Sequence, residues 1–549
     1  MQNISVLKTE LIVYGATPAG ILAAIVAARN GVKCLILEPT EHFGGLITSG
    51  LNATDLGTQK TLISVVREFY VRAGKKYDKD IELRPESKVA QQVFQEMMDE
   101  SGVKLYLKHE IIRLMKGSDK VHFAEASNGS IFRASHWIDA TYEGDLLPLA
   151  GVTYTMGRES RSFYGESMAG RGSPISIAPP GMDKISPNDI FGKRLKFVSD
   201  YDHLHPGDAD ASLQAFSFRL TLTRNQVNRL NIPDPAQYDP ADFELFRRMS
   251  TGVKNNPPTL VAGTFRSMYF NLAQLPNDKY DLNSGLIPSL NLPVINSEWL
   301  NSTCKGREKI YQTYKEYTLQ ALYFMRTDQS VPSEIREFFS QFGLCADEYK
   351  NTGGWSPALY VREGRRLVGD TVLTQTSISD STLDGPDSIG VARYHFDCKH
   401  TRWMVSKDGS HVVKEGMFYS KTSPMYSLDY RIMLPKLMEC SNMLVTCAAS
   451  ASHVAFSSLR MEPHWMLLGA AAGYAVTISK NAKVNLHNVT GRKIRAMLAV
   501  QPEPTTFPLD DQRSVSHKEE AAFEIPKSKK KSFGSNLFSL FRASKETLK

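Results

Sequence analysis

The sequence predicts an α/β protein that begins with a strand–turn–helix–strand unit, and three observations predict this fold. Residues 11–14 (LIVY) are a short apolar run typical of a buried strand. Residues 21–30 are small and helix-favouring, and a glycine follows them. Residues 34–37 (CLIL) are a second apolar run, which ends in Glu38. We therefore expect a Rossmann-like βαβ unit that starts a parallel sheet.

The turn between the first strand and the helix has residues typical of a dinucleotide-binding site. Gly15 lets the strand turn sharply, and Gly20 lets the helix pack closely on the sheet. Thr17 stands where a middle glycine is usual; it leaves less room but offers a hydroxyl, and Pro18 and Ala19 complete the turn. Because the free N–H groups and the dipole of a helix start favour negative charge, we expect a pyrophosphate here.

Glu38 and the glycine pair that follows it extend this predicted site. The Glu38 carboxylate is placed to accept hydrogen bonds from ribose hydroxyls and to repel a 2′-phosphate. Gly44 and Gly45 begin a small, polar loop that is placed to run past a bound cofactor. The alternative is an ordinary α/β unit with a glycine turn. The strand context, the acid and the glycine pair together favour the nucleotide site.

Length and composition indicate a globular protein of more than one domain. The chain has 549 residues, of which 42% are hydrophobic and 22% charged. No apolar run approaches the ~20 residues that span a bilayer, and the N-terminal residues lead directly into the first strand, so we expect no signal peptide. The six cysteines are scattered and include no C-x-x-C pair. This spacing predicts a reducing, cytoplasmic location, no metal site and no dithiol redox pair.

The net charge of +7 comes mainly from the C-terminal end. Seven of the 65 Lys and Arg residues but one of the 58 acids fall in residues 527–549, which leaves +1 for the rest. We therefore expect no nucleic-acid partner. Residues 495–549 are predicted to be a disordered basic tail, in which residues 532–544 form an amphipathic segment. The tail is a candidate for contact with an anionic membrane surface or a partner, and the alternative is a solvated tail.

Further elements follow from periodicity and turn residues. We expect helices at residues 63–74, 87–101, 311–327 and 333–342, and strands at residues 103–107, 111–114, 121–124, 131–134, 214–222 and 443–447. The four strands between residues 103 and 134 are expected to form a meander. A strand that ends in Asp139, Ala140 and Thr141 then returns to the parallel sheet beside the predicted cofactor site.

Several motifs give the chain a resemblance to a known family. They are YGATPAG, EPTEHFGGLITSGL, WIDATYEGDLLPLAGV, GRESRSFYGESMAG, VREGRRLVGD, YHFDCKHT and SASHVAFSSLRMEPHWMLLGAAAGYA. Over residues 8–480 the chain resembles the FAD-dependent oxidoreductase family of the glutathione-reductase-like superfamily. The resemblance implies bound FAD and a discontinuous FAD-binding domain, residues 1–160 and 430–490. It also implies an inserted mixed α+β substrate domain at residues 161–429. No second glycine turn follows a strand, so we expect no nicotinamide domain.

The stretch around Pro463 is the second part of the predicted cofactor site. Pro463 is a natural first residue of a helix that continues to residue 479. The resemblance implies that this helix start, with Arg460 and Glu462, faces the flavin pyrimidine, where reduction leaves negative charge. The isoalloxazine is expected between the Gly44–Gly45 loop and this helix start. The alternative is a core helix that starts with a proline by chance.

Two clusters are candidates for substrate chemistry. Arg362, Arg365 and Arg366 suit bidentate capture of a carboxylate or phosphate, and the alternative is that they hold carboxylates between domains. His400 matches the family motif best and is the first candidate for a general base. His453 is the second, although a lone histidine is more often structural.

These expectations combine into one functional hypothesis. The chain is predicted to bind FAD non-covalently and to transfer a hydride from a small polar, or anionic, substrate to flavin N5, with base assistance from His400 or His453. Covalent attachment of the flavin through His42 is the minor alternative for cofactor binding. A flavin-dependent monooxygenase or oxidase is one alternative function. A non-catalytic flavin-containing protein that binds partners is the other.

Overall fold

A five-stranded parallel sheet joins the two ends of the chain. The computed structural model describes residues 6–178, 182, 184–255, 267–293 and 295–499. The sheet has the order β24-β8-β2-β3-β4. Its strands are β2 (Leu11–Tyr14), β3 (Cys34–Leu37), β4 (Lys104–Tyr106), β8 (His136–Asp139) and β24 (Met443–Val445). A Rossmann-like α/β fold is therefore present, and its carboxyl edge brings Gly15, Glu38 and Ala140 together.

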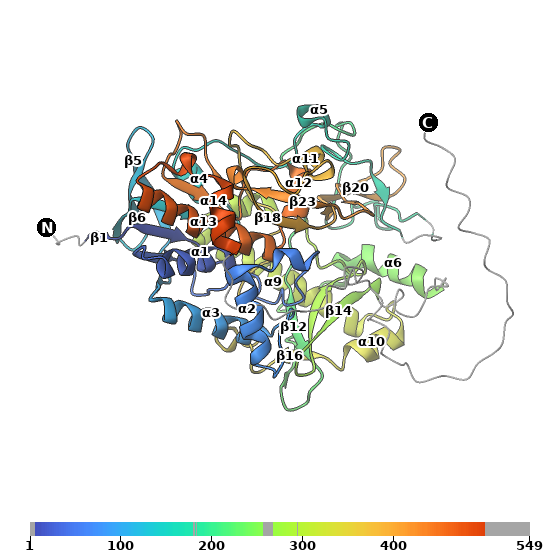
Figure 1. Cartoon of the computed structure of the whole chain (residues 1–549). Helices are drawn as coiled ribbons and strands as arrows, with labels where there is room; N and C mark the ends of the chain where they lie inside the picture. The colour runs from blue at the N-terminus through green and yellow to red at the C-terminus, as the bar shows by residue number, and fades with distance from the viewer. Residues whose placement is uncertain (1–5, 179–181, 183, 256–266, 294, 500–549) are drawn as a thin grey trace. The chain divides into compact units, whose positions relative to one another are not determined.

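Helices cover one face of this sheet. They are α1 (Pro18–Arg29), α2 (Ser64–Lys75), α3 (Ser87–Ser101) and α13 (Glu462–Ala482). Figure 1 shows α1 and α13 side by side, although about 430 residues separate them in the sequence. Their backbones are close because small residues face each other: a Cβ on Gly469 would lie 2.1 Å from the Ala19 oxygen, and one on Gly473 2.5 Å from the Ala23 oxygen.

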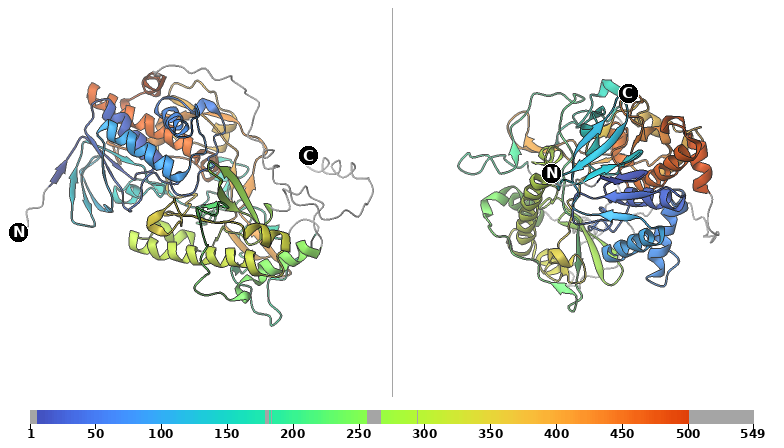
Figure 2. Two further views of the ribbon diagram at one scale, coloured as in Figure 1. Left: turned by 90° about the horizontal axis from the view of Figure 1, so that it is seen from below. Right: turned by 90° about the vertical axis from the view of Figure 1, so that its left-hand side faces the viewer.

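A second, four-stranded sheet covers the other face. Its order is β1-β7-β6-β5, and its strands are β1 (Val6–Lys8), β5 (Ile111–Lys116), β6 (Val121–Ala126) and β7 (Ile131–Arg133). Leu11 and Val13 pack against the helices, whereas Ile12 and Tyr14 pack against the second sheet, as strand alternation requires. The right-hand view of Figure 2 shows the blue strands next to the cyan ones.

The expected meander is therefore partly wrong. Residues 111–134 form the antiparallel β5, β6 and β7, but β4 pairs in parallel with β3. The physical reason is that β4 follows α3, and a strand that follows a crossover helix returns to the parallel sheet. Val103, just before β4, packs in the core that the helices share with the parallel sheet.

A five-stranded sheet with the order β13-β16-β12-β15-β14 is the centre of the middle part of the chain. Its strands are β12 (Leu220–Thr223), β13 (Arg229–Leu230), β14 (Phe270–Leu275), β15 (Lys279–Ser284) and β16 (Gly343–Cys345). The accompanying helices are α6 (Glu244–Asn255), α8 (Asn296–Leu300), α9 (Cys304–Thr327) and α10 (Ser333–Phe339). The left-hand view of Figure 2 shows α9 as the long yellow-green helix.

Two boundaries here differ from the sequence prediction. Helix α9 begins at Cys304 instead of residue 311, because the Thr303 hydroxyl caps it by accepting a hydrogen bond from the Gly306 N–H. The predicted strand at residues 214–222 is regular only over β12. Residues 214–217 have mainly side-chain partners and isolated bridges instead of a ladder.

The remaining elements are short. The strands are β9 (Tyr154–Thr155), β10 (Ile175–Ser176), β11 (Val198–Ser199), β17 (Arg366–Leu367), β18 (Ser388–Arg393), β19 (Asp397–Cys398), β20 (Arg402–Val405), β21 (Val412–Glu415), β22 (Phe418–Tyr419) and β23 (Met425–Asp429). The helices are α4 (Leu146–Leu149), α5 (Arg161–Tyr164), α11 (Gln375–Ser379), α12 (His453–Leu459) and α14 (Gly491–Ala499).

The predicted division into domains is not marked by a separation in the structure. All the residues that the structure describes belong to one compact unit. The discontinuous boundaries given above therefore remain a prediction. Helix α14 continues to Ala499, so regular structure extends beyond residue 495, and the rest of the predicted tail lies outside the described residues. Among the described helices none combines the length and the apolar character needed to cross a membrane.

Candidate functional site

The turn after β2 is built from backbone contacts that only glycine permits. Gly15 has a φ of 99°, and a Cβ there would lie 2.9 Å from the Ala140 carbonyl carbon. A Cβ on Gly20 would lie 2.1 Å from the Gly15 oxygen. Thr17 caps α1 by accepting a hydrogen bond from the Gly20 N–H (3.2 Å), and its hydroxyl donates to the Ala140 oxygen (2.7 Å). Thr17 therefore connects the turn to the end of β8, a role that the motif alone did not indicate.

The start of α1 offers free donors to an anion. Pro18 has no N–H, and the N–H groups of Thr17 and Ala19 have no hydrogen-bond partner among the described residues. Both groups belong to the first turn of a helix, where the dipole also favours negative charge. This donor set fits a pyrophosphate.

Glu38 is nearly buried at the end of β3. Its carboxylate accepts hydrogen bonds from the Ala16 N–H (2.8 Å), the Thr40 N–H (2.9 Å) and the Thr40 hydroxyl (2.7 Å). A carboxylate has about four acceptor positions, so one remains for a ribose hydroxyl. Burial raises the pKa of Glu38, while the hydrogen bonds from Thr40 and Ala16 oppose that shift.

Tyr142 joins the glycine loop to the start of α13. Its hydroxyl accepts a hydrogen bond from the Leu46 N–H (3.0 Å) and donates one to Glu462 Oε1 (2.5 Å). A Cβ on Gly45 would lie 2.3 Å from the same hydroxyl, and the Gly44 N–H donates to the Ala16 oxygen (2.7 Å). The loop and the helix start thus lie together as the sequence predicts, but Tyr142 was not among the predicted site residues.

Polar atoms without partners gather at the start of α13. Glu462 Oε2, Trp465 Nε1 and Arg460 Nε are buried and have no hydrogen-bond partner in the described part of the chain. Burial raises the pKa of Glu462 to about 8, although the hydrogen bond from Tyr142 lowers it, so the carboxyl is mainly protonated at neutral pH. Pro463 occupies the first turn of the helix. Unpaired polar groups at a helix start fit the polar edge of a flavin.

The side chains of Asp139 and Thr141 bond to each other and to the backbone, so their role is to support the cofactor site. Asp139 accepts hydrogen bonds from the N–H and the hydroxyl of Thr141 and from the Leu146 N–H. Burial raises the pKa of this carboxyl to about 7, and its bonds to Thr141 oppose the shift. Both side chains therefore hold the end of β8 in place, and that end supports Gly15 and Thr17.

Arg362 and the backbone of His400 contact residues 214–217, and His453 is linked to this segment through Glu363. The Ala215 N–H donates to the His400 backbone oxygen (2.9 Å), and the Ala215 oxygen accepts from Arg362 Nη1 (3.4 Å). The same Nη1 donates to the Ser217 hydroxyl (3.2 Å). Gln214 donates through Nε2 to Glu363 (3.4 Å), which in turn bonds to His453. The sequence showed only apolar alternation here and gave no signal for this role.

His453 belongs to a buried ionic network. Its Nδ1 lies 2.8 Å from Glu363 Oε1, and its Nε2 lies 3.6 Å from Cys398 Sγ. Arg366 bridges Glu363 (2.7 Å) and Glu159 (2.6 Å). Burial alone would lower the pKa of His453, but the Glu363 charge outweighs it and raises the pKa to about 10. His453 is therefore a cation at neutral pH and is suited to donate a proton or to stabilise negative charge nearby.

His400 is in the opposite protonation state. The side chain is buried, stacks on Trp403, and has its Nε2 at 3.2 Å from the Asn291 oxygen. Burial first, and then the charge of Lys414, lowers the pKa of His400 to about 3. Its imidazole is therefore neutral at neutral pH, as a proton acceptor must be.

The three clustered arginines have different partners. Arg365 pairs with Asp145 (3.2 Å) and donates to the Leu300 oxygen, away from residues 214–217. Arg366 pairs with Glu363 and Glu159. For these two, the alternative interpretation, in which arginines hold carboxylates, describes what the structure contains. Arg362 alone has no carboxylate within 4 Å in the described part of the chain.

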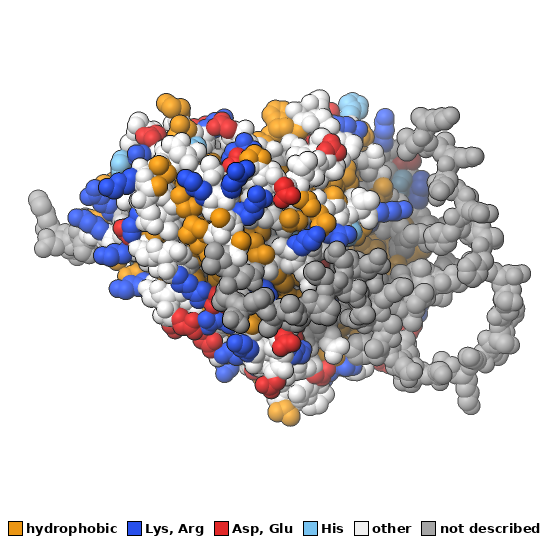
Figure 3. Space-filling view, in the orientation of Figure 1, with side chains coloured by type: hydrophobic (Ala, Val, Ile, Leu, Met, Phe, Trp, Pro, Cys, Tyr) orange, Lys and Arg blue, Asp and Glu red, His pale blue; other side chains and the backbone are white. Residues whose placement is uncertain are grey.

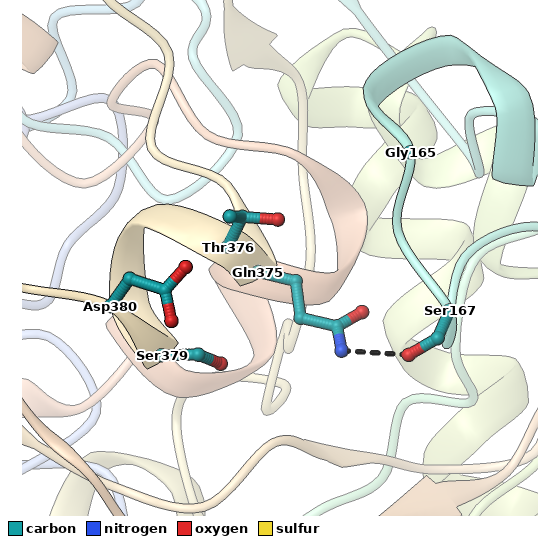
Figure 4. A pocket seen from close by; sticks show the side chains of 6 residues that line it. All are labelled: Gly165, Ser167, Gln375, Thr376, Ser379 and Asp380. Carbon is teal, nitrogen blue, oxygen red and sulfur yellow. Dashed lines mark hydrogen bonds between the residues drawn. The ribbon is translucent and has the colours of Figure 1, made fainter.

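Other polar groups make internal contacts or line a small pocket. Glu86, Asp347 and Glu348 approach one another closely enough to hold a cation, but the buried Lys279 ammonium lies between them at 2.6, 2.9 and 2.6 Å. A pocket of about 250 Å³ is lined by Gly165, Ser167, Gln375, Thr376, Ser379 and Asp380, and Figure 4 shows these residues. This volume is below the ~300–1,000 Å³ typical of ligand sites. His42 lies 2.8 Å from the Thr48 hydroxyl, on the loop that leads from Glu38.

Comparison with protein families identifies the chain. The model of the family described as FAD dependent oxidoreductase matches residues 10–498, so the chain belongs to this family. Its cofactor is FAD, which agrees with the donor set at the start of α1 and the unpaired groups at the start of α13. A search of curated proteins found no match.

Solved structures give only distant similarities. Bacillithiol disulfide reductase Bdr (YpdA) from Staphylococcus aureus is 20% identical over 29% of this chain and 43% of that chain, with a TM-score of 0.21. The anhydrotetracycline hydroxylase OxyS from Streptomyces rimosus is 13% identical over 30% of this chain and 40% of that chain, with a TM-score of 0.22. The matched regions span less than half of those proteins. The assignment therefore depends on the family match and the geometry.

Proposed function

We propose that this FAD-dependent oxidoreductase oxidises a small polar substrate that binds against residues 214–217. The observation that carries the proposal is that Arg362 and the backbone of His400 contact this segment, to which His453 is linked through Glu363. Arg460 connects the segment to the cofactor side. It precedes α13, and its Nη1 donates to the Tyr360 hydroxyl (2.9 Å), while the Tyr360 N–H donates to the Ser217 oxygen (2.8 Å). When bound, FAD supplies an isoalloxazine ring whose N5 accepts a hydride.

The residues of the chain divide the remaining work. The N–H groups of Thr17 and Ala19 hold the pyrophosphate, and Glu38 holds the ribose. The start of α13 and Arg460 stabilise negative charge on the reduced cofactor, the helix end by about 0.3–2 kcal/mol. His400, which is neutral, accepts the proton that the substrate loses on oxidation. His453 keeps its proton and balances the Glu363 charge.

A spectroscopic experiment tests this proposal. We expect the purified protein to absorb near the flavin bands at about 370 and 450 nm, and acid precipitation to release the colour into the supernatant. The protein is then mixed anaerobically with small hydroxy acids, amino acids, amines and alcohols. We expect one of these classes to bleach the band of the oxidised flavin at ~450 nm. His400→Gln should slow that bleaching by about 10²–10⁴-fold while the flavin stays bound.

The outcomes separate the alternatives. A flavin that no donor reduces would contradict the proposal and favour a non-catalytic flavoprotein. Rapid oxygen consumption in the presence of a reductant would favour an oxidase or monooxygenase. Colour that stays in the acid pellet would indicate covalent attachment, with His42 as the first residue to replace.

Location and partners complete the proposal. We propose a cytoplasmic location, since all six cysteines are free thiols, a state that a reducing compartment preserves. Figure 3 shows positive and negative side chains intermingled on one face, which supports the absence of a nucleic-acid footprint there. The basic tail is proposed to contact an anionic membrane surface. Co-sedimentation with anionic liposomes should decrease when the chain ends at Pro526, and equal binding by both chains would exclude this contact.

A further inference from the structure

Arg362 is a buried cation whose hydrogen bonds are incomplete. Its side chain is 2% exposed, and its guanidinium carbon lies 4.1 Å from the centre of the Tyr360 ring. Only Nη1 is bonded, to the Ala215 oxygen and the Ser217 hydroxyl. Nε and Nη2 make no hydrogen bond to any residue that the structure describes. These two atoms form one of the guanidinium edges that pair bidentately with a carboxylate.

The neighbouring acids already have partners. Asp281 is held by Arg219 through two hydrogen bonds of 2.7 and 2.6 Å. Asp397 lies 3.6 Å from both Arg460 and Lys399, so one carboxylate serves two cations. No carboxylate of the described residues therefore pairs with Arg362 within 4 Å, and the Asp397 charge that acts on Arg362 is shared with Arg460 and Lys399.

This imbalance is unfavourable unless an anion is supplied. Burial, together with the charges of Arg460 and Arg219, lowers the pKa of Arg362 to about 10, although the Tyr360 hydroxyl opposes the shift. The group stays a cation at neutral pH, and a buried charge without a counter-charge raises the free energy of the folded state. A bound anion would remove that cost, so the arrangement favours ligands with one negative charge.

We propose that the substrate is a small carboxylate, and that its carboxylate group binds the Nε–Nη2 edge of Arg362 above residues 215–217. The inference rests on the proposed function and specifies its substrate class. Ala215 connects Arg362 to the predicted base, because its oxygen accepts a hydrogen bond from Arg362 and its N–H donates to the His400 backbone oxygen.

The test compares anions with neutral molecules of the same shape on the FAD-loaded protein. Isothermal titration with acetate, propionate and benzoate is set beside acetamide, propionamide and benzamide, and inorganic phosphate is a further probe. We expect at least one carboxylate to bind about 10- to 100-fold more tightly than its amide, the effect of a charge-assisted bidentate pair. Arg362→Gln should remove this preference, and Arg362→Lys should restore only part of it.

A surface arginine provides the matched control. Arg431 pairs with Asp429 and is half exposed, so Arg431→Gln removes the same charge and should leave the preference unchanged. Equal binding of carboxylates and amides would overturn the proposal, as would tight carboxylate binding by Arg362→Gln. Preference for phosphate would assign the site to a different anion and also overturn it.

Flavin retention separates this inference from the proposed function. If Arg362→Gln loses FAD but the remaining holoprotein still prefers carboxylates, Arg362 serves the cofactor and the inference is wrong. If carboxylates bind through Arg362 but no donor reduces the flavin, the inference stands as a binding site and the proposed reaction fails. Binding is measured without turnover, so the two failures are distinguishable.

Discussion

The cofactor side and the substrate side of this site are held together in different ways. On the cofactor side, Gly15, Gly20 and Gly45 bring backbone atoms within distances that no side chain permits. On the substrate side, charged groups from distant segments form the contacts, such as Glu363 with His453 and Arg366. The first side depends on volume and the second on charge. Changes in side-chain size should therefore affect one side, and changes in charge or pH the other.

The largest effect on FAD binding is expected from Gly20→Ala, which tests the cofactor side by volume. The added Cβ would lie 2.1 Å from the Gly15 oxygen and 2.9 Å from the Ala140 Cβ, and backbone atoms cannot yield cheaply. We expect loss of bound FAD and a free energy of unfolding lower by about 1–3 kcal/mol or more. Flavin absorbance per protein and urea denaturation measure both. Gly385→Ala is the control, since nothing lies within 4 Å of its added Cβ; normal flavin content in Gly20→Ala would contradict the close-contact argument.

Lys279→Met removes a buried charge from the middle part of the chain, which also contains residues 214–217. It therefore tests how far charge stabilises that part. The Lys279 side chain is fully buried between Glu86, Asp347 and Glu348. Its removal leaves the buried carboxylates of Glu86 and Glu348 with only the partly exposed Lys88 as a nearby cation, and we expect a loss of about 3–5 kcal/mol in the free energy of unfolding.

Lys88→Met is the matched control for this substitution. Lys88 contacts Asp347 but is 42% exposed, and exposed pairs contribute about 0–1 kcal/mol. Similar losses in the two variants, measured by urea denaturation, would show that burial does not set the energy of this cluster.

Glu363→Gln tests the substrate side by pH. The folded-state pKa of His453 is about 10, against an ordinary value of 6.5. The stability that this proton contributes is complete below the unfolded pKa and is lost as the pH rises through the folded pKa. The variant should be less stable by about 3 kcal/mol near neutral pH, as expected when one partner of a buried pair is removed.

The variant should also lose less stability between about pH 7 and pH 9.5, where folded wild type still holds the His453 proton and the unfolded chain has lost it. Urea denaturation at four pH values measures the slope, and His453→Gln should flatten it equally. An unchanged alkaline slope in Glu363→Gln would contradict the assignment of the pKa shift to this pair.

The same contrast explains how much the sequence could predict. The βαβ unit, the position of Glu38 and the glycine loop follow from local spacing, because residues 11–45 determine their own geometry. The identity of Tyr142 as the bridge to Glu462 could not follow, since 320 positions separate the two residues. Gln214, Ala215 and Ser217 gave no signal, because their contacts to Glu363, His400 and Arg362 exist only after folding.

The sequence showed where charged residues cluster, but it did not show which of them form ion pairs. Arg362, Arg365 and Arg366 look equivalent as a run, yet two of them are paired with acids and one is not. His400 was the first candidate for a base and His453 the second. The structure gives them opposite protonation states, because burial and then the Lys414 charge lower the pKa of His400, whereas His453 contacts a carboxylate that raises its pKa.

The smallest effect is expected from Glu38→Ala. This substitution removes a charge from the cofactor side, whose structure depends on close contacts at glycines. Glu38 keeps one acceptor position beyond its bonds to Ala16 and Thr40. Loss of the one charge-assisted bond to the ribose should weaken FAD binding by about 10- to 100-fold. The protein should still fold, because the backbone contacts at Gly15 and Gly20 do not involve this side chain. Fluorescence titration of the apoprotein with FAD measures the dissociation constant, and Glu38→Gln, which keeps an acceptor, should lose less. An unchanged dissociation constant in Glu38→Ala would exclude the ribose assignment, whereas an unfolded variant would mean that the cofactor side also depends on charge.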